Sequence, residues 1–594
     1  MTTGSRSPAT DSSSDDPLSI PLLLGDLRVD VYDYKVSCAK RLGMIAIAIG
    51  PERTRKELLT LLPDYFDVED EILSYIAEEL GTMIPFIGGQ EYYPSLVSPL
   101  EKLCLIEDMA VSQKATQSLQ LLIQASTAPE LSDTYMEMLN HLSAGEWFTG
   151  KVAAASLIPH VFKQFPSTKP ELVKILNTLA KDQTPMVRET VGKSLETPIP
   201  YLTREDLNTI VIPLLTTLYK DDLDVVRLVC VQPCPLLATL IPPEDVNQHI
   251  APIIRDLSAD KAWRVRQSVA DHLDQWIQQC PSTIKLDALN IWIKLVKDDE
   301  CEVRLSALSK LLIIAPVIFQ LPPLDQAFSK EFSSIARSLF NDDVLRVREM
   351  IAKTIVQLAP HFGKMRTTTE LVPLVKEFLN KEDTPEVKLA LLQNMNVLLE
   401  LLEPAQIDDL LHSQLDALAY NRQWRIREAM LKLIPQLVKQ MPREFFNQNL
   451  LKVSLGLLGD SVFNVRATAC QNMQELTKIL GSQWAVQMLV PNVSKLATEK
   501  HYLYRMTTLL AVSSLAPAFN PEELEEHLLP IALRFSTDTV PNLRFNLCKC
   551  LAAIRPYLRS EAAIGKVKQT LEHLQNDKDK DVKYHAQKAL TEYK

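Results

Sequence analysis

A short phrase that begins with a polar or acidic residue and ends in an aliphatic residue and arginine recurs along the whole chain. It reads DKAWRVRQ at 260–267 and NRQWRIRE at 421–428. The basic or equivalent position occurs fifteen times at steps of 37 to 44 residues, and each of the last five steps is 39. This near-constant period predicts a solenoid of stacked repeats. The positions are Lys35, Leu73, Lys114, Lys151, Arg188, Arg227, Arg266, Arg304, Arg348, Lys388, Arg427, Arg466, Arg505, Arg544 and Lys583.

Each repeat is predicted to contain two helices. Glycine is scarce, with 15 in 594 residues, and leucine and alanine recur at helical spacing. An aliphatic pair followed by proline marks the first helix, which the proline can bend. The second helix opens at the Val-Arg phrase. The marker prolines are Pro213, Pro252, Pro373, Pro491 and Pro530.

The sequence indicates where the second helix starts in two repeats. Thr184 and Thr384 suit an N-cap, and the prolines after them suit the first helical position. The valine of the phrase then points to the core. The arginine can reach the aspartate or the turn carbonyls of a neighbouring repeat, so we expect a charge-assisted contact repeated along the stack rather than ligand binding by these arginines.

A two-helix unit near 39 residues, with proline in its first helix and Asp…Val-Arg at its turn, resembles the HEAT repeat. Tetratricopeptide and ankyrin repeats are shorter, at about 34 and 33 residues. The expected fold class is therefore all-α, an α-solenoid (horseshoe) of about fifteen HEAT repeats, each a helical hairpin. The 44-residue step before Arg348 predicts a longer loop there.

Several function classes have little support. The net charge of -11 provides no basic stripe for nucleic acid. The nine scattered cysteines are expected to be reduced core thiols of a cytoplasmic or nuclear protein. The apolar run 43–50 is too short to span a membrane and is expected to be one buried helix end. Residues 1–17 are expected to form a disordered polar tail without a signal peptide.

Catalysis is not expected. The chain contains no G-x-x-x-x-G-K-S/T, G-x-G-x-x-G, G-x-S-x-G or H-E-x-x-H phrase, and its ten histidines do not cluster. We therefore expect no catalytic residue, metal or cofactor. What remains is a long surface of the kind on which repeat proteins hold other proteins.

Three tryptophans fall at near-equivalent turns between the two helices of a repeat: Trp147, Trp263 and Trp424. Each ring could pack on the adjacent turn, or it could be an exposed interface anchor. Their recurrence, twice with a flanking arginine, favours binding. Trp276, Trp292 and Trp484 lie within helical patterns and are expected in the core.

Phrases spread over nearly the whole chain resemble the scaffolding A (65 kDa regulatory) subunit family of protein phosphatase 2A. They include ERTRKELL (52–59), GEWFT, DQTPMVR, DKAWRVR, REFF, HYLYRMTTLL, NLRFN and DVKYHAQKAL. The resemblance implies a non-catalytic scaffold on which repeats 11 to 15 (401–594) hold the phosphatase catalytic subunit. It also implies that the N-terminal part of repeats 1 to 10 (18–400) receives an exchangeable regulatory B subunit.

The resemblance assigns site residues in two groups. Those implied to contact the catalytic subunit of the phosphatase are Gln423, Trp424, Arg425, Phe463, Tyr502, Arg505 and Val540. Those implied to contact the regulatory B subunit of the phosphatase are Trp147, Pro185, Met186 and Trp263. The chain departs from the family pattern at Glu189 and Gln423, where a basic residue is common.

Two other interpretations stay open from the sequence alone. One is a nuclear transport receptor of the importin-β kind, which is also acidic and built from HEAT repeats. The other is a HEAT regulatory subunit of a related phosphatase. In all three, the partners are proteins rather than nucleic acid or membrane.

Overall fold

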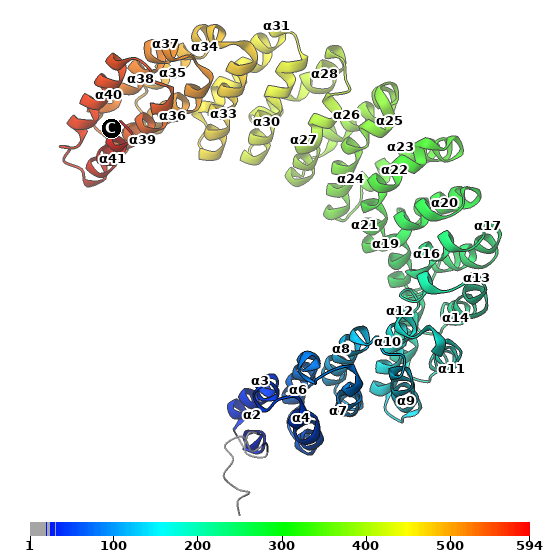
Figure 1. Ribbon diagram of the computed structural model, residues 1–594. Coiled ribbons are helices and arrows are strands. Elements are labelled where there is room, and N and C mark those ends of the chain that lie inside the picture. Colours follow the sequence, from blue (N-terminus) through cyan, green and yellow to red (C-terminus); the bar gives the residue numbers. More distant parts are fainter. Residues whose placement is uncertain (1–19, 21–23, 30, 594) are drawn as a thin grey trace, which may run out of the picture. The chain divides into compact units, whose positions relative to one another are not determined.

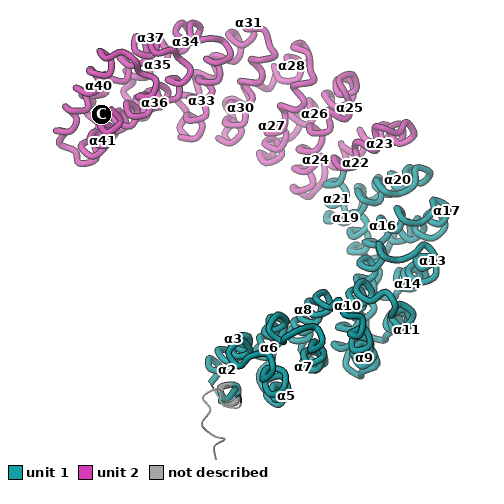
Figure 2. Tube along the Cα trace, viewed as in Figure 1, with its two compact units in different colours: residues 1–310 teal, residues 311–594 magenta. Residues whose placement is uncertain are grey.

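The computed structural model describes residue 20, residues 24–29 and residues 31–593. The predicted tail at 1–17 lies outside these residues. The described residues form helices joined by short turns and contain no strand (Figure 1). They divide into two compact units, residues 1–310 and 311–594 (Figure 2). The predicted all-α solenoid of helical hairpins is confirmed.

Unit 1 alternates first and second helices along the chain. Its first helices, some interrupted, are α4 (Pro51–Arg53) with α5 (Leu59–Leu61), α7 (Pro94–Cys104), α9 (Leu131–Ala144), α11 (Lys169–Leu179), α13 (Arg204–Asp206) with α14 (Ile212–Leu218), α17 (Pro243–Asp245) with α18 (Ala251–Leu257), and α20 (Lys285–Leu295). Its second helices are α2 (Tyr32–Ala39) with α3 (Leu42–Ile49), α6 (Asp70–Thr82), α8 (Met109–Ala125), α10 (Phe148–Gln164), α12 (Pro185–Ser194), α15 (Asp224–Leu228) with α16 (Pro233–Leu240), α19 (Trp263–Gln279) and α21 (Cys301–Ser309).

Unit 2 continues the same alternation. Its first helices are α23 (Pro322–Phe340), α25 (Ala359–Arg366) with α26 (Val372–Lys381), α28 (Pro404–Leu411) with α29 (Leu415–Ala419), α31 (Arg443–Phe445) with α32 (Leu451–Gly456), α34 (Ser482–Met488) with α35 (Val490–Leu496), α37 (Pro521–Glu523) with α38 (Leu529–Leu533), and α40 (Glu561–Leu574). Its second helices are α22 (Leu311–Gln320), α24 (Leu345–Gln357), α27 (Pro385–Leu399), α30 (Trp424–Gln440), α33 (Phe463–Leu480), α36 (Tyr502–Leu515), α39 (Pro541–Ile554) and α41 (Lys580–Thr591).

The core lies between successive helices. Within unit 2, α30 packs against α33, α33 against α36, and α36 against α39. The aliphatic residue of the repeated phrase is buried at the start of the second helix, as predicted: Val187, Val265 and Ile426 are each at most 1% exposed. Burial of one such side chain stabilises the fold by about 1.5–3 kcal/mol, and this contribution recurs in each repeat.

The first helices bend where the marker prolines lie. A five-residue π-helical turn ends two residues before each of four of them, at η8 (Leu207–Val211), η9 (Val246–Ile250), η11 (Thr367–Leu371) and η16 (Leu524–Leu528). Proline has no N–H, and its ring clashes with the carbonyl four residues earlier, so a wider turn accommodates it. The same turn occurs at η13 (Phe446–Leu450), where Lys452 occupies the proline position. The bend therefore belongs to the repeat and does not require the proline.

An aspartate and an arginine join neighbouring repeats. Arg227 donates from Nε to Oδ2 of Asp260 at 2.7 Å and from Nη2 to Oδ1 at 2.8 Å. We call this contact the inter-repeat ion pair. The Asp260 carboxylate also accepts the backbone N–H of Ala262 at 2.8 Å, so one side chain shapes its own turn and binds the preceding repeat. The same bidentate pairing occurs at Arg188–Asp221, Arg266–Asp298, Arg427–Asp460, Arg505–Asp538 and Arg544–Asp577.

The predicted contact is confirmed with two corrections. The carbonyls that the arginine reaches belong to its own turn rather than to a neighbouring repeat: Arg227 Nη1 donates to the carbonyl of Asp221 at 2.8 Å. Thr184 is at the predicted N-cap position, but its side chain makes no capping bond. Its N–H instead donates to Asp182 at 2.8 Å, so the acidic residue closes the turn.

The ion pairs shift the pKa of both partners. Burial alone would raise the pKa of Asp260, but the hydrogen bonds from Arg227 and the Ala262 N–H outweigh it and lower the pKa. For Asp577 the hydrogen bond from Arg544 is the largest influence, and it lowers the pKa against the opposing effect of burial. The pKa of Arg544 is raised, first by its hydrogen bond to Asp577. Both members of the pair are therefore charged in the folded chain.

At one junction of unit 2 the acidic residue of the turn is replaced by a neutral one. Asn421 occupies the position of the aspartate that would face Lys388, and its Oδ1 accepts the N–H of Gln423 at 2.9 Å. Asn421 thus keeps the turn-closing bond but lacks the charge. A lysine can serve in this pairing, because Lys151 contacts Asp182 at 2.8 Å.

Three further expectations are corrected or refined. In the run 43–50, Met44 and Ile47 are exposed, so only one side of α3 is buried. The long step before Arg348 reflects the 19-residue helix α23 rather than a longer loop. All nine cysteines are free thiols, as expected, and eight are buried, while Cys301 is half-buried.

Asn421→Asp should stabilise unit 2. The new carboxylate would face Lys388 and restore an inter-repeat ion pair, which we expect to raise the free energy of unfolding by about 0.5–1 kcal/mol. Urea denaturation measures the change. Asn447→Asp, at an exposed position of η13, makes the same charge change away from the turn and should leave the midpoint unchanged. Equal effects of the two substitutions would contradict the proposed pairing.

The ion pairs should also make stability depend on acid pH. Because the pKa values of Asp260, Asp460 and Asp577 are lower in the folded chain than the ordinary value near 3.9, their contribution is complete above about pH 4 and is lost as the pH falls further. Urea titrations between about pH 6 and pH 2.5 should show this loss. Asp577→Asn should reduce the acid slope; an unchanged slope would show that this pair does not contribute.

Candidate functional site: the row of inter-helix turns

The residues predicted to bind partners lie at one structural position, the start of the second helix of a repeat. Trp424, Phe463 and Tyr502 are the first residues of α30, α33 and α36, and Val540 is the N-cap of α39. The ion pair between Arg427 and Asp460 fixes the start of α30 beside the turn that precedes α33. The turns of unit 2 therefore form a row, which we call the C-terminal turn row: Gln423, Trp424, Arg425, Phe463, Tyr502 and Val540.

The C-terminal turn row is exposed but not uniformly. Phe463 is 59% exposed and Tyr502 is 39% exposed. Gln423 and Arg425 are exposed, while Trp424 and Val540 are half-buried. Large apolar side chains with this exposure, held on rigid helix ends, are suited to serve as interface anchors.

Arg505 differs from the other predicted residues. Its guanidinium donates to both carboxylate oxygens of Asp538, at 2.9 and 3.1 Å, and to the carbonyls of Glu499 and Lys500. The side chain is 15% exposed. The structure therefore gives Arg505 a role in holding repeats together; its predicted contact with a partner stays a prediction.

Two of the turn tryptophans, Trp263 and Trp424, contact the arginine that follows each of them. Arg425 lies 5.0 Å from the ring centroid of Trp424, and Arg264 lies 4.8 Å from that of Trp263. Such cation–π contacts are worth roughly 0.5–1 kcal/mol at exposed sites. They orient both groups at the surface, where a partner can use the apolar ring and the charge together. Trp276, Trp292 and Trp484 are buried, as predicted.

Unit 1 has a corresponding row, which we call the N-terminal turn row: Trp147, Pro185, Met186 and Trp263. Trp147 is the N-cap of α10 and is 52% exposed, and Met186 in α12 is 42% exposed. Pro185 and Trp263 are half-buried at the first positions of α12 and α19.

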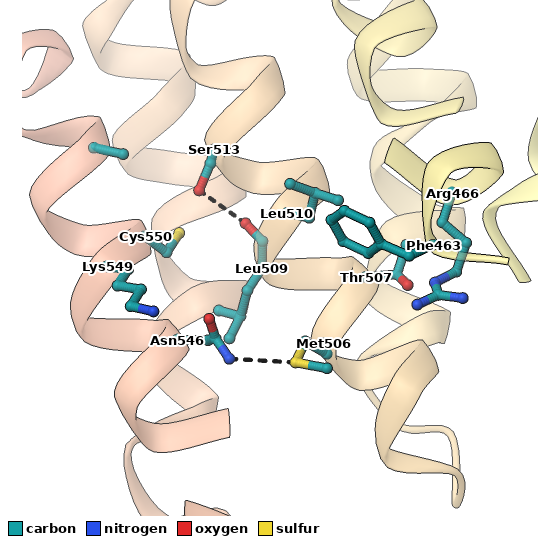
Figure 3. Close-up of a pocket in the computed structure, with 11 residues that line it drawn as sticks. Phe463, Arg466, Met506, Thr507, Leu509, Leu510, Ser513, Asn546, Lys549 and Cys550 are labelled. Carbon is teal, nitrogen blue, oxygen red and sulfur yellow. Dashed lines mark hydrogen bonds between the residues drawn. The ribbon is translucent and has the colours of Figure 1, made fainter. Parts of the chain in front are cut away.

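Two features of unit 2 were not predicted. Tyr420 is 61% exposed, directly after α29 and four residues before Trp424. An aromatic residue in the predicted turn was the available signal. The second feature is a pocket below Phe463, lined by α33, α36 and α39 (Figure 3). Of the apolar residues in its wall, Leu509 is buried, whereas Met506 and Leu510 are half-buried.

The described residues offer no evidence of other chemistry. No group of three or more histidine, cysteine or acidic side chains among them is arranged to hold a metal ion. Burial raises the pKa of the Cys104 thiol to about 12 and that of Cys550 to about 11, so both are protonated at neutral pH. None of the helices in the described ranges has the length and apolarity needed to cross a bilayer.

Fold and site together define a HEAT-type α-solenoid with two rows of exposed turn residues suited to protein binding. No protein-family model matches the chain. Curated proteins do match the chain in sequence, and their names are those of the family that the sequence resembles.

The regulatory A subunit of protein phosphatase PP2A from Schizosaccharomyces pombe is 32% identical over 264 residues, which cover 44% of this chain and 45% of that protein. The A alpha isoform of the serine/threonine-protein phosphatase 2A 65 kDa regulatory subunit from Arabidopsis thaliana is 37% identical over 183 residues, 30% of this chain and 31% of that protein. The human A beta isoform is 34% identical over 189 residues, which cover 32% of this chain and 31% of that protein. The chain thus matches less than half the length of these relatives, and its resemblance to the regulatory A subunits of PP2A is confirmed.

Solved structures support the fold. A Kap95p chain, from a study of Kap95p with RanGDP, aligns with a TM-score of 0.60 at 12% identity, covering 97% of this chain and 76% of that one. An importin β structure aligns with a TM-score of 0.57 at 11% identity, covering 97% and 81%. At these identities the likeness shows a shared helical-repeat solenoid and nothing of the partners.

Arg505→Gln and Arg425→Gln should separate the structural arginine from the surface arginine. Arg505→Gln leaves Asp538 without its cation and should lower the free energy of unfolding by about 1–3 kcal/mol. Arg425→Gln removes an exposed charge whose assigned contact is with the Trp424 ring, so the change should stay within about 0.5 kcal/mol. Urea denaturation of both variants provides the comparison, and equal losses would contradict the assignment.

Proposed function

We propose that this chain is a non-catalytic scaffold subunit of a protein phosphatase 2A-type serine/threonine phosphatase. The observation that supports this most is the coincidence of two findings. The curated relatives from fungi, plants and mammals are regulatory A subunits of this phosphatase, and several turn residues that the family resemblance selects, among them Trp147, Phe463 and Tyr502, are exposed.

In this proposal the phosphatase catalytic subunit binds the turns of repeats 11 to 15, within 401–594. The C-terminal turn row supplies the anchors. Trp424, Phe463 and Tyr502 would bury apolar rings in the interface, while Arg425 would add a charged hydrogen-bond donor. The ion pairs at Arg427–Asp460 and Arg505–Asp538 hold neighbouring turns in register, so the anchors are ordered before binding and lose little conformational entropy on association.

An exchangeable regulatory subunit would bind the N-terminal turn row, within 18–400. Trp147 and Met186 are the exposed anchors there, and Pro185 fixes the backbone at the start of α12. Glu189, half-buried in α12, forms a helical ion pair with Lys193, so the acidic departure from the family pattern lies next to this row. The choice among regulatory subunits would depend in part on this charge.

The scaffold would act through proximity and contribute no catalytic group. Holding the catalytic and the substrate-selecting subunits on one chain raises the concentration of each near the other, which strengthens their joint action without any new contact between them. We propose that the protein is located in the cytoplasm and also in the nucleus.

Trp424→Ala should weaken binding of a purified 2A-type catalytic subunit by at least about 2 kcal/mol, or roughly thirtyfold in Kd, because a half-buried aromatic anchor is removed. Isothermal titration calorimetry measures the affinity, and circular dichroism checks the fold. Trp147→Ala is the matched control: it removes the same side chain at a near-equivalent turn position of the other row and should leave the affinity within twofold.

The possible results separate the claims. Tight binding that Trp424→Ala does not weaken would retain the scaffold and remove the anchor. Equal losses from both substitutions would show that the effect is not local to the C-terminal turn row. A native chain that does not bind the catalytic subunit would rule out the phosphatase assignment.

A further inference from the structure

The pocket below Phe463 has a chemistry that the turn row does not explain. It has a volume of about 320 Å³ and extends over three successive second helices, from the start of α33 onto the faces of α36 and α39 (Figure 3). Met506, Leu509 and Leu510 form an apolar wall. Two cations, Arg466 and Lys549, line the same pocket. A pocket of this size accommodates one or two side chains of a binding partner.

Arg466 is the arginine of the repeated phrase that lacks its acidic partner. It is 95% buried, being 5% exposed, and its Nη1 donates to the carbonyls of Asp460 and Ser461 at 2.7 and 3.1 Å. Within the part of the chain that the structure describes, its Nε and Nη2 have no hydrogen-bond or ion-pair partner. The position that supplies aspartate in other repeats is Glu499, which does not pair with it.

A buried guanidinium without a carboxylate is costly, because its desolvation is only partly compensated. Its remaining contact is with the Phe463 ring, 5.8 Å from the ring centroid. In the other repeats compared above, the same arginine is neutralised within the fold. The unfilled bonding capacity of Arg466 therefore points to an anion supplied from outside the chain.

Lys549 adds a second positive charge. It is exposed on α39, lies 4.7 Å from the Phe545 ring centroid, and forms no ion pair within the described ranges. The chain as a whole carries a net charge of -11, so two cations without an ion-pair partner in the described residues around one apolar pocket are a local exception. Asn546 and Ser513 line the pocket too, but both donate within the chain, to the Asn542 and Leu509 carbonyls.

We propose that this pocket binds an extended segment of a partner polypeptide that presents two carboxylate side chains and a large aliphatic side chain. Arg466 and Lys549 lie at opposite ends of the pocket (Figure 3), so one carboxylate of the segment pairs with Arg466 and a second carboxylate of the same segment with Lys549, while the aliphatic group packs on Met506, Leu509 and Leu510. A polypeptide is favoured because the pocket adjoins the exposed Phe463 of the C-terminal turn row, so one partner can contact both. The site follows from this chain's own charges and does not rest on the identity of the catalytic subunit.

A peptide titration tests the site directly. The probe is a fluorescein-labelled peptide of alternating glutamate and leucine, added to the full chain and followed by fluorescence anisotropy. Replacing its glutamates with glutamine should weaken binding about tenfold, as expected for a lost charge-assisted contact. Lys549→Gln should weaken it to a similar extent. Lys566→Gln, an equal charge change at an exposed position of α40 outside the pocket, should change the Kd less than twofold.

A second variant tests the pocket itself. Ala553 is an exposed lining residue, so Ala553→Phe should obstruct the pocket without disturbing the core, and binding should fall at least about fivefold. Ala562→Phe, exposed on α40, is its control and should bind normally. The proposal is overturned if the native chain does not bind the peptide, if the glutamine peptide binds equally well, or if Lys549→Gln and Ala553→Phe have no more effect than their controls. Because this assay contains no phosphatase subunit, its failure would leave the scaffold proposal intact.

Discussion

The aspartate of the inter-helix turn is the group on which stacking depends wherever it occurs, because its carboxylate forms two kinds of contact at once. At Asp260 one carboxylate closes the turn through the Ala262 N–H and receives the guanidinium of Arg227 from the preceding repeat. Turn conformation and stacking are therefore coupled through a single side chain. In a solenoid, where each repeat contacts only its neighbours, such a contact supplies part of the nearest-neighbour energy that makes the array cooperative.

The phrase WRVR illustrates how one helix turn separates structure from function. In α19 the first two residues, Trp263 and Arg264, contact each other at the surface, the third, Val265, is buried, and the fourth, Arg266, pairs with Asp298. Successive residues of a helix point about 100° apart, so neighbouring residues of the phrase face the surface, the core and the adjacent repeat in turn. The same arrangement recurs in α30 from Trp424 to Arg427. The binding residues are thus ordered by the residues beside them.

Much of the fold could be predicted because it is periodic. The spacing of the phrase located the second helices, the buried Val265 and Ile426, and the partners of the arginines. What could not be predicted depends on geometry between repeats. No local pattern distinguishes Arg466, which lacks a carboxylate, from Arg427, which has one, since the outcome depends on whether Glu499 or Asp460 reaches across. Likewise, the pocket combines residues from three repeats, and no spacing in the sequence indicates it.

The π-helical turns of the first helices affect how a repeat tolerates insertions and deletions. First helices range from the uninterrupted 19 residues of α23 to pairs of short segments joined through η9 or η16, whereas the second helices keep a 39-residue spacing over the last repeats. A π turn accommodates one extra residue in a helix, because its hydrogen bonds join residues five apart instead of four. Insertions and deletions can therefore be absorbed in the first helices while the turn rows retain their pitch. A solenoid built this way can diverge in sequence and length on one layer and still present the same spacing of contacts on the other.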